Sequence, residues 1–479
     1  MNYKIVLRVL AFLSIFLGFG MLLPLPFSYY YDSGDAQSLI ISAVICFAIG
    51  TLAFITTDKK NDLKTKDGFA IVTFGWIIMA LLGSLPYVLS GAIPSFTDAF
   101  FESMSGFTTT GSTILSEIES LPKGILLWRS ITHWFGGMGI IVLTIAILPF
   151  LGIGGMSLFK AESPGPISDR LKPRITQTAK LLWGVYLLFT ASELVLLMLG
   201  GMDFYNSLNH AFATLATGGF STYNSSIAGQ SAYIQYVIIF FMFLAGTNFS
   251  LHYHWLKGDF KSVMKSTEFQ FYFFMVLVSS VFIFTDIYSM YEGAVEPAIR
   301  DVVFQVLAIV TTTGFATADF EQWSMASQVL ILALMFSGGM AGSTSGGMKI
   351  IRVMLLLKFA RKQFVKVLHP KAISPIKVGD TRIDDKVMHD VLGYFVLYIF
   401  ILAMSIYLLI LFGLDFETAI GSAVTAINNI GPGLNLTGPT DNFGFLPDFS
   451  KWLMSFLMLV GRLEVLTVII LLAPSYWQK

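Results

Sequence analysis

Long apolar runs, each about the length of a membrane-spanning helix, recur along the chain. A helix that crosses a bilayer needs roughly 20 apolar residues. Runs of this kind predict ten spanning helices, at 5–30, 37–57, 68–92, 125–151, 177–200, 232–256, 270–290, 326–356, 387–413 and 450–474. Four further stretches are too short or too polar to span, at 96–122, 203–230, 294–322 and 415–445.

The composition supports a polytopic membrane protein. The 479 residues are 55% hydrophobic and 13% charged, and the mean hydropathy is +0.72. A soluble domain cannot bury that much apolar surface. Lys4 and Arg8 precede the first apolar run, but no small-residue cleavage site follows, so this run predicts a retained helix and not a signal peptide. The single Cys46 cannot form an internal disulfide.

Basic residues predict the orientation in the membrane. If the N-terminus is cytoplasmic, 25 of the 30 Lys and Arg residues fall in inner loops or at the termini, ten of them between Lys349 and Lys386. This positive-inside bias predicts an even number of spans with both ends inside. Acidic residues gather outside, among them Glu321 and Asp441, and either concentrate cations at an outer mouth or only solvate the loops.

The four shorter stretches are copies of one another. They align without gaps on Gly111, Gly219, Gly314 and Gly431, as DAFFESMSGFTTTGST, NSLNHAFATLATGGFS, DVVFQVLAIVTTTGFA and TAIGSAVTAINNIGPG. Each begins with a residue that favours a helix N-cap: Asp98, Asn206, Asp301 and Thr418. Each glycine has one predicted span before it and another after it. The chain is therefore expected to repeat a unit of helix, short re-entrant helix, loop and helix four times.

This repeated unit predicts an ion pathway. Irregular backbone at membrane depth must be buried in protein or line a water-filled path. A short helix that enters from outside points its partially negative C-terminal end inward, toward a cation. Four loops around an axis can then replace the hydration shell of the ion with carbonyl oxygens. The alternative is that small residues only let helices pack closely, but four copies in register favour the pore.

At these loops the sequence resembles the Trk/Ktr/HKT superfamily of cation transporters. Further matches lie at Trp134–Pro149, Ser337–Arg352 and Gly461–Leu466, so the resemblance covers nearly the whole chain. The extra N-terminal helical pair resembles the TrkH type of membrane subunit more than the shorter Ktr type. The expected fold is an all-α polytopic membrane protein with four pseudo-symmetric helix–pore-helix–helix repeats around one pore. The expected division is an N-terminal hairpin at 1–66 and repeats at 67–175, 176–268, 269–385 and 386–479.

The resemblance implies bacterial potassium uptake across the inner membrane. It implies a homodimer with one pore per protomer and a cytosolic regulatory subunit of the TrkA type, on which a nucleotide (NAD or ATP/ADP) is expected. Glycine at all four filter positions implies a preference for potassium, whereas serine at the first position is associated with sodium transport in plant relatives. The predicted filter residues are Thr109, Thr110, Gly111, Thr217, Gly218, Gly219, Thr312, Thr313, Gly314, Asn429, Ile430 and Gly431.

A glycine-rich interruption within the run 326–356 predicts a gate. The sequence SGGMAGSTSGG cannot hold a straight helix, since each glycine costs roughly 1 kcal/mol relative to alanine. Broken helices often mark the transport path, and the resemblance implies a movable loop below the filter. The alternative is close packing by small residues. The predicted gate residues are Gly338, Gly339, Gly342, Ser343, Thr344, Gly346, Gly347 and Arg462.

Arg462 and Glu464 of the last predicted span and Glu193 of the fifth are candidate intramembrane charges. A charge there is costly and is a functional candidate by default. The resemblance implies that Arg462 lies near the gate loop and repels cations in the closed state. Glu464 is expected to pair with another helix, and Glu193 has no predicted role. A purely structural ion pair is the alternative for each.

Other signals are weak. The basic inner loops Glu162–Arg174 and Lys358–Lys386 are either docking surfaces for the partner or only topology signals. The glycines of Leu151–Phe159 lack dinucleotide spacing, and the sequence has no P-loop, so no nucleotide site is expected on this chain.

Two other functions compete with potassium uptake. One is a sodium-selective or proton-coupled symporter, which the sequence cannot distinguish from channel-like flow. The other is a membrane-embedded enzyme that uses His133, Glu193 or His210, although these residues are scattered along the chain.

Overall fold

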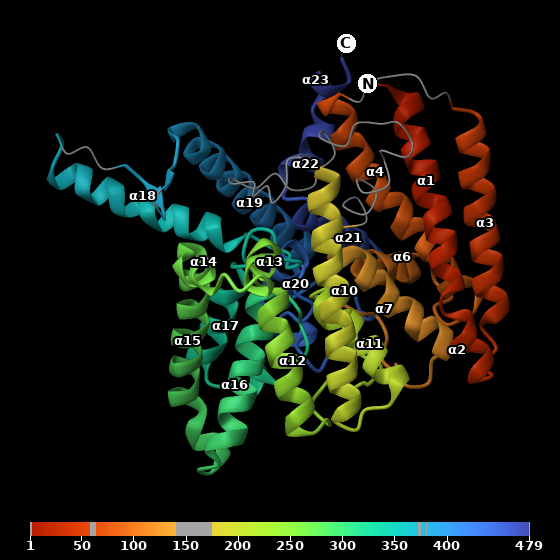
Figure 1. The fold of residues 1–479 in the computed structure, drawn as a ribbon, viewed down its shortest axis with the longest axis horizontal. Coiled ribbons are helices and arrows are strands. Elements are labelled where there is room, and N and C mark those ends of the chain that lie inside the picture. The colour runs from red at the N-terminus through yellow and green to blue at the C-terminus, as the bar shows by residue number, and fades with distance from the viewer. Residues whose placement is uncertain (1, 58–63, 140–174, 372–374, 380, 479) are drawn as a thin grey trace.

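The computed structural model describes residues 2–57, 64–139, 175–371, 375–379 and 381–478, without the side chains at 65 and 175–178. This part of the chain is almost entirely helical (Figure 1). The exception is a two-residue antiparallel pair, β1 (Lys377–Val378) and β2 (Thr381–Arg382), which joins Lys377 to Arg382 and Val378 to Thr381. The expected all-α class is confirmed.

An N-terminal hairpin precedes the repeats. It consists of α1 (Tyr3–Leu22), the short α2 (Leu25–Tyr30) and α3 (Ala36–Ile55). Glycine permits the close contact of its two long helices, because a Cβ at Gly50 would lie 2.8 Å from the Ala11 carbonyl oxygen. Asp35 ties the hairpin to the first repeat, since its carboxylate accepts the Ile125 N–H at 2.7 Å.

The remaining helices follow the predicted fourfold order. The first unit comprises α4 (Thr65–Gly83), α5 (Leu85–Leu89), α6 (Phe96–Phe107) and α7 (Lys123–Gly137). The second comprises α10 (Ile175–Leu199), α11 (Phe204–Leu215), α12 (Ala232–Ala245), α13 (Phe249–Leu256) and α14 (Phe260–Lys265). The third comprises α15 (Thr267–Ile287), η2 (Tyr288–Tyr291), α16 (Val295–Val310), η3 (Phe320–Gln322), α17 (Met325–Met335) and α18 (Ile350–Leu368). The fourth comprises α19 (Asp385–Leu411), α20 (Phe416–Asn428), η4 (Asn435–Thr437), α21 (Asp448–Arg462), α22 (Leu466–Ile469), η5 (Ile470–Leu472) and α23 (Pro474–Trp477).

The predicted spans can be matched to these helices one by one. Within the described residues, six helices are long and apolar enough to cross a membrane, and up to eight if each bent pair counts as one span. Of the other two predictions, 125–151 runs from α7 into residues that the structure does not describe. The second, 326–356, is divided into α17 and α18 by the glycine-rich loop.

Two spans that were predicted as continuous are sharply bent. The angle between α12 and α13 is 105°, and the angle between α21 and the last helical turns is 112°. The second bend follows from the backbone, because Glu464 and Val465 both have positive φ (56° and 58°), which interrupts right-handed helix. Sequence hydropathy does not report such breaks, since the residues on both sides remain apolar.

The predicted N-caps were wrong by about one helical turn in three repeats and by about two turns in the third. The caps of α6, α11 and α20 are Ser95, Asp203 and Asp415, whose side chains accept the backbone N–H of Asp98, Asn206 and Thr418. The aligned residues are thus the third helical residues, where the bound N–H lies. In α16 the helix begins at Val295, well before Asp301.

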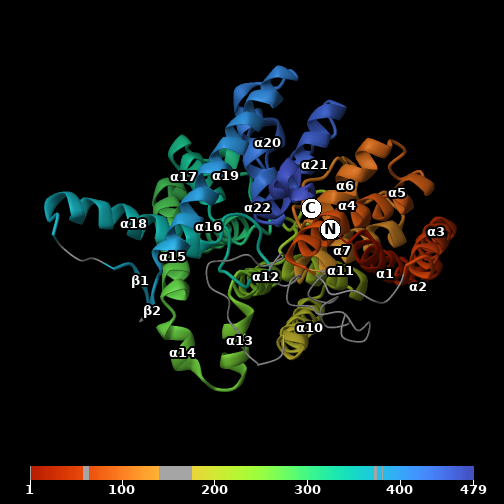
Figure 2. The same cartoon turned by 90° about the horizontal axis from the view of Figure 1, so that it is seen from above.

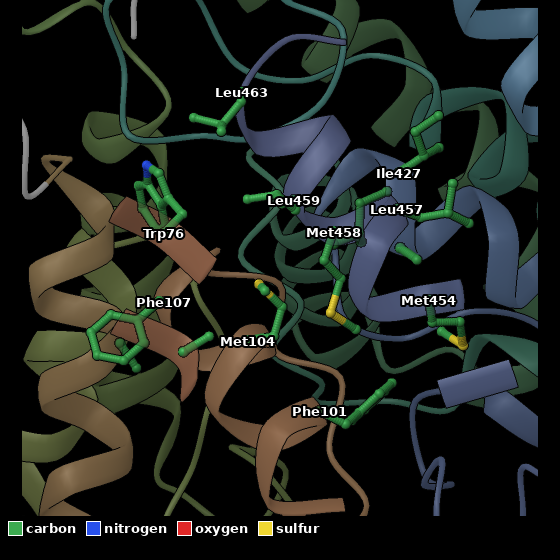
Figure 3. Packing of buried hydrophobic residues seen from close by; sticks show 14 of the residues in the cluster. Trp76, Phe101, Met104, Phe107, Ile427, Met454, Leu457, Met458, Leu459 and Leu463 are labelled. Carbon is green, nitrogen blue, oxygen red and sulfur yellow. The ribbon is translucent and has the colours of Figure 1, made fainter. Parts of the chain in front are cut away.

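The core lies where the short helices meet the spans around them. In Figure 3, Phe101, Met104 and Phe107 of α6 gather with Met458 and Leu459 of α21. All five side chains are buried. The short helices are therefore enclosed by protein, as irregular backbone at membrane depth requires.

The two ends of the described chain lie at the same end of the molecule (Figures 1 and 2). The Asn2 N–H donates to Asp67 at 2.8 Å. The Tyr476 hydroxyl donates to the Lys66 carbonyl oxygen. This arrangement agrees with an even number of spans.

Candidate functional site

Each of the four short helices ends with the same backbone cap. One or two residues after α6, α11, α16 and α20, a residue takes a left-handed conformation: Thr109 (φ 52°), Thr217 (φ 55°), Thr312 (φ 56°) and Asn429 (φ 54°). The next N–H then bonds back to a helix carbonyl: Thr110 to Ser105 (2.9 Å), Gly218 to Ala213 (2.8 Å), Thr313 to Ala308 (2.8 Å) and Ile430 to Thr425 (3.1 Å). This bond satisfies a carbonyl that the helix end would leave unpaired.

Three of these caps are strained. Asn tolerates the left-handed region, but a β-branched Thr there is an outlier that costs of order 1–3 kcal/mol. The same strain recurs at Thr109, Thr217 and Thr312. Strain of this kind persists where the surrounding structure holds it, and it clusters at functional sites.

The four aligned glycines form a closed ring. Each has positive φ, between 75° and 106°. A Cβ added to any one of them would collide with, or closely approach, a carbonyl oxygen of the next repeat. The pairs are Gly111 with Gly218 (2.1 Å), Gly219 with Thr313 (2.0 Å), Gly314 with Ile430 (1.9 Å) and Gly431 with Thr110 (3.0 Å). Only glycine fits this arrangement without displacement of backbone. Each repeat contacts the next, and the fourth contacts the first, so the ring is closed.

The ring surrounds a single cavity. All four glycines line one cavity of about 150 Å³. Its outer rim includes Asp441 and Gly438. Peptide oxygens around a narrow opening are the groups that replace water around a monovalent cation. The residues predicted for the filter thus converge, although they lie in four distant parts of the sequence.

One acid at the outer rim titrates near neutral pH. The Glu321 carboxylate lies against Gly438, where an added Cβ would be 2.5 Å from its Oε2. Burial, and next the nearby Asp319, raise the pKa of Glu321 to about 7. The charge of the mouth therefore changes over the physiological pH range.

The glycine-rich loop between α17 and α18 lies directly against the filter loops. The Gly346 N–H donates to Thr312 Oγ1 at 2.7 Å. A Cβ at Gly346 would lie 2.6 Å from the Cβ of Asn429. The loop also folds on itself, since a Cβ at Gly338 would lie 2.1 Å from the Gly346 carbonyl oxygen. Small residues here allow the loop to fit against two filter loops.

The other predicted gate residues of this loop stabilise its compact conformation. Gly339 packs against Ser345, and a Cβ there would be 2.4 Å from its Oγ. Gly342 and Gly347 have positive φ of 75° and 64°. The Ser343 hydroxyl donates to the Met340 carbonyl at 2.6 Å.

Arg462 joins this loop to α7. Its Nη1 donates to the Thr344 carbonyl oxygen at 2.7 Å, and its Nη2 donates to the carbonyl oxygens of Gly136 (2.5 Å) and Gly137 (3.0 Å). Loop and arginine are therefore in contact, as expected. The guanidinium places a fixed positive charge beside the loop.

The remaining intramembrane acids behave differently from one another. Glu464 forms an ion pair with Arg352 of α18, and the Arg352 guanidinium lies 4.2 Å from the Tyr394 ring centroid. The expected partner on another helix therefore exists. Glu193 is fully buried on α10. The predicted docking loop Glu162–Arg174 lies outside the described residues.

The histidines serve as hydrogen-bonding groups. His133 Nδ1 donates to the Gly106 carbonyl at 2.7 Å, and its Nε2 accepts the Phe220 N–H at 3.2 Å. These two partners require the neutral ring, because one nitrogen must donate and the other must accept. In the described part of the chain, no three His, Cys, Asp or Glu residues are placed to hold a metal ion.

A buried ion pair behind the first two loops was not predicted. Glu102 of α6 and Arg129 of α7 lie 2.8 Å apart, with side-chain exposures of 0% and 1%. Arg129 lies inside the predicted span 125–151, where a charge is a functional candidate by default, so this signal could have identified it. The signal that identifies Glu102 is its position in the four aligned stretches.

The comparisons with known proteins agree with this architecture. A family model described as TrkH, cation transport protein, matches residues 35–479. The chain is 37% identical to "Trk system potassium uptake protein TrkH" of Escherichia coli K12, over all of both chains. It is 37% identical to "Trk system potassium uptake protein TrkI" of Halomonas elongata, over 99% of this chain and 97% of the other.

A solved structure has the same fold. The crystal structure of the potassium transporter TrkH from Vibrio parahaemolyticus superposes with a TM-score of 0.90 and 35% sequence identity, and the match covers all of both chains. The similarity therefore extends over the N-terminal hairpin and all four repeats.

Proposed function

Because this chain belongs to the TrkH family of cation transport proteins, we propose that it is the pore-forming subunit of a potassium uptake system. The observation that carries the proposal is the closed ring of four glycines around one cavity. The relatives named above are potassium uptake proteins. The family consists of transporters, so the alternative of a membrane-embedded enzyme is excluded.

The filter is proposed to work by replacing water with peptide oxygens. A potassium ion sheds its hydration shell as it enters the cavity and is coordinated by carbonyls of the residues on either side of each of the four left-handed cap residues. The four helix C-terminal ends contribute partial negative charge toward the same point. Selectivity then depends on how well the ring keeps its size, because a ring that adapts freely also accepts sodium.

The glycine-rich loop is proposed to be the gate. In the present state it is bound to Thr312 above and to Arg462 beside it. A cation that leaves the filter meets this loop and a positive charge, both of which oppose passage. Release of the loop from these contacts opens the path. The inside-negative potential then contributes about 2.3 kcal/mol per charge per 100 mV to inward movement.

The subunit is proposed to act as a homodimer in the bacterial inner membrane, with both termini in the cytoplasm. A cytosolic nucleotide-binding subunit of the TrkA type is proposed to control the gate. Support comes from α18, which directly follows the loop and projects from the helical bundle (Figures 1 and 2). Phe364, Val367 and Leu368 near its end are more than 70% exposed, as expected of a surface that a partner covers.

Substitution of one ring glycine tests the filter. In Gly314→Ser, the new Cβ would lie 1.9 Å from the Ile430 carbonyl oxygen, so the ring must widen on one side. We expect the ratio of rubidium to sodium uptake into proteoliposomes to fall by about tenfold, equivalent to about 1.4 kcal/mol. The matched control is Gly91→Ser, because Gly91 has nearly the same φ (73°) but no atom within 4 Å of an added Cβ.

The control separates backbone strain from ring geometry. Gly91→Ser should keep the ratio of the unaltered protein. An unchanged ratio in folded Gly314→Ser would refute the filter assignment. Sodium uptake that exceeds rubidium uptake in the unaltered protein would instead support the sodium-selective alternative.

A further inference from the structure

A polar residue at one aligned position supports the filter loop in three of the four repeats. The position is the fourth after Asp98 and its equivalents, and it holds Glu102, His210, Gln305 and Ser422. All four side chains are buried and lie on the short helices. Such residues are unexpected inside an apolar bundle, because a buried polar group is costly unless it is hydrogen-bonded.

In the first two repeats this residue contacts the same point of the loop. Glu102 accepts hydrogen bonds from Thr113 Oγ1 at 2.9 Å and from the Ile114 N–H at 3.0 Å. His210 Nε2 lies 3.0 Å from Ser221 Oγ. Thr113 and Ser221 both stand two residues after the ring glycine. Different side chains thus make the same hydrogen bond, which joins the short helix to the loop segment that follows the ring glycine.

The third and fourth repeats hold the loop through different contacts. Ala316 replaces the hydroxyl residue in the third, and there Gln305 Nε2 donates to the Ala318 carbonyl oxygen two residues farther on. In the fourth, small residues let the backbone pack directly, since a Cβ at Gly421 would lie 2.4 Å from the Leu434 nitrogen. In this repeat the loop segment after the ring glycine packs closely against α20, and no long polar side chain is needed to hold it.

Arg129 extends the support from the first loop to the second. Its Nε donates to Glu102 at 2.8 Å, and its Nη1 donates to the Ser221 carbonyl oxygen at 3.3 Å. Its guanidinium lies 4.0 Å from the Phe220 ring centroid, and the His133 ring lies 4.0 Å from the same centroid. Phe220, directly after the ring glycine Gly219, thus contacts two side chains of α7.

We infer that Glu102, His210, Gln305 and Arg129 are positioning residues that determine ion selectivity by holding the first three loops of the ring in place. They contact no predicted ion-binding carbonyl directly. They contact the loop segments that follow the ring glycines. This inference rests on the proposed function and assigns to it the residues that stiffen the filter. Without them, the loops are expected to adapt to sodium as readily as to potassium.

Two variants test the inference in different repeats. Glu102→Gln removes the charged member, and Gln305→Met removes the neutral bond without leaving an unpaired charge. The ratio of rubidium to sodium uptake into proteoliposomes should fall by about tenfold and about fivefold, since hydrogen bonds to charged groups are stronger than neutral ones. Glu102→Gln/Arg129→Gln, which removes both charges, should lose selectivity as Glu102→Gln does.

Asp98→Asn is the matched control. Asp98 lies on the same helix as Glu102 and pairs with Lys451 at 2.6 Å, but that pair lies at the outer end of the helix. Asp98→Asn should keep the uptake ratio even if its melting temperature falls. A role in folding alone would lower the melting temperature of all variants and leave the ratio unchanged.

The outcomes separate the two proposals. Folded Glu102→Gln and Gln305→Met proteins with the ratio of the unaltered protein would overturn the inference and leave potassium uptake intact. If Glu102→Gln fails to fold, the uptake ratio of Gln305→Met alone tests the inference. An unaltered protein with no preference for rubidium would overturn the proposed function itself.

Discussion

At the scale of single residues, the ring glycines and the strained threonines have complementary roles. Glycine is required because neighbouring carbonyl oxygens occupy the space of a side chain, within 2.1 Å at three of the four positions. Threonine is not required by its backbone geometry, which it adopts at a cost. At Thr312 the hydroxyl offers a reason for its presence, because Thr312 Oγ1 accepts the Gly346 N–H and so connects the filter loop to the glycine-rich loop.

The pKa of Glu321 leads to a prediction about pH. Since burial raises this pKa to about 7, the carboxyl group is neutral below pH 7 and charged above it. A unit charge about 10 Å away in water contributes about 0.4 kcal/mol. We therefore expect the apparent KM for rubidium uptake to rise about twofold as the outer pH falls from 8 to 6, at low ionic strength.

Glu321→Gln should remove most of this pH dependence and hold KM at the acidic value. Glu292→Gln is the control, because Glu292 is an exposed outer acid, whereas the Glu321 carboxylate lies against Gly438 of the cavity lining. The same pH dependence in Glu321→Gln as in the unaltered protein would assign the titration to another group.

At the scale of elements, hydropathy predicted where helices occur but not where they break. The ten apolar runs and the four short helices are present at the expected positions where the structure describes them. The bends after α12 and α21 were missed, because the residues on both sides of each break remain apolar; the second bend coincides with positive φ at Glu464 and Val465. The N-caps were placed one or two turns too late, because the alignment identifies equivalent residues but not the start of the helix.

The contact between the gate loop and α21 leads to a prediction about flux. A hydrogen bond from a charged group contributes about 1.5–3 kcal/mol. If the loop is the gate, as proposed, the bond from Arg462 to Thr344 favours its closed position over the open one by about tenfold or more. Arg462→Gln also removes a positive charge from the path. We expect rubidium flux through the isolated subunit to rise by about tenfold, measured in proteoliposomes under an imposed voltage.

Arg300→Gln is suited as the control for this experiment. Arg300 forms a partly exposed ion pair with Glu296 on the outer part of α16, away from the loop. Its flux should match that of the unaltered protein. A lower flux in folded Arg462→Gln would mean that the arginine assists permeation and does not block it.

At the scale of the whole molecule, the repeat itself was the most informative signal. The family resemblance and the fold class read from the sequence are confirmed by the family match and by the similarity to a solved TrkH structure. The internal alignment also predicted which residues converge. The ion pair of Glu102 and Arg129 was not foreseen, because a charge pair between two helices depends on how they are oriented in three dimensions.

The net charge of zero conceals a separation of charge along the pathway. Asp441 lines the outer cavity and the Glu321 carboxylate lies against Gly438 of its lining, whereas Arg462 lies beside the glycine-rich loop. In the proposed mechanism, a cation is attracted at the entrance and opposed at the gate. This arrangement fits uptake that is driven by voltage and controlled from the inside.

The position of a bound ion tests the central claim most directly. Thallium is a heavy monovalent cation whose anomalous scattering locates it in a crystal. Crystals grown with thallium in place of potassium should show density on the shared axis of the ring, within bonding distance of carbonyl oxygens from all four loops. Thallium that binds only at the acidic rim, with an empty ring, would contradict the account.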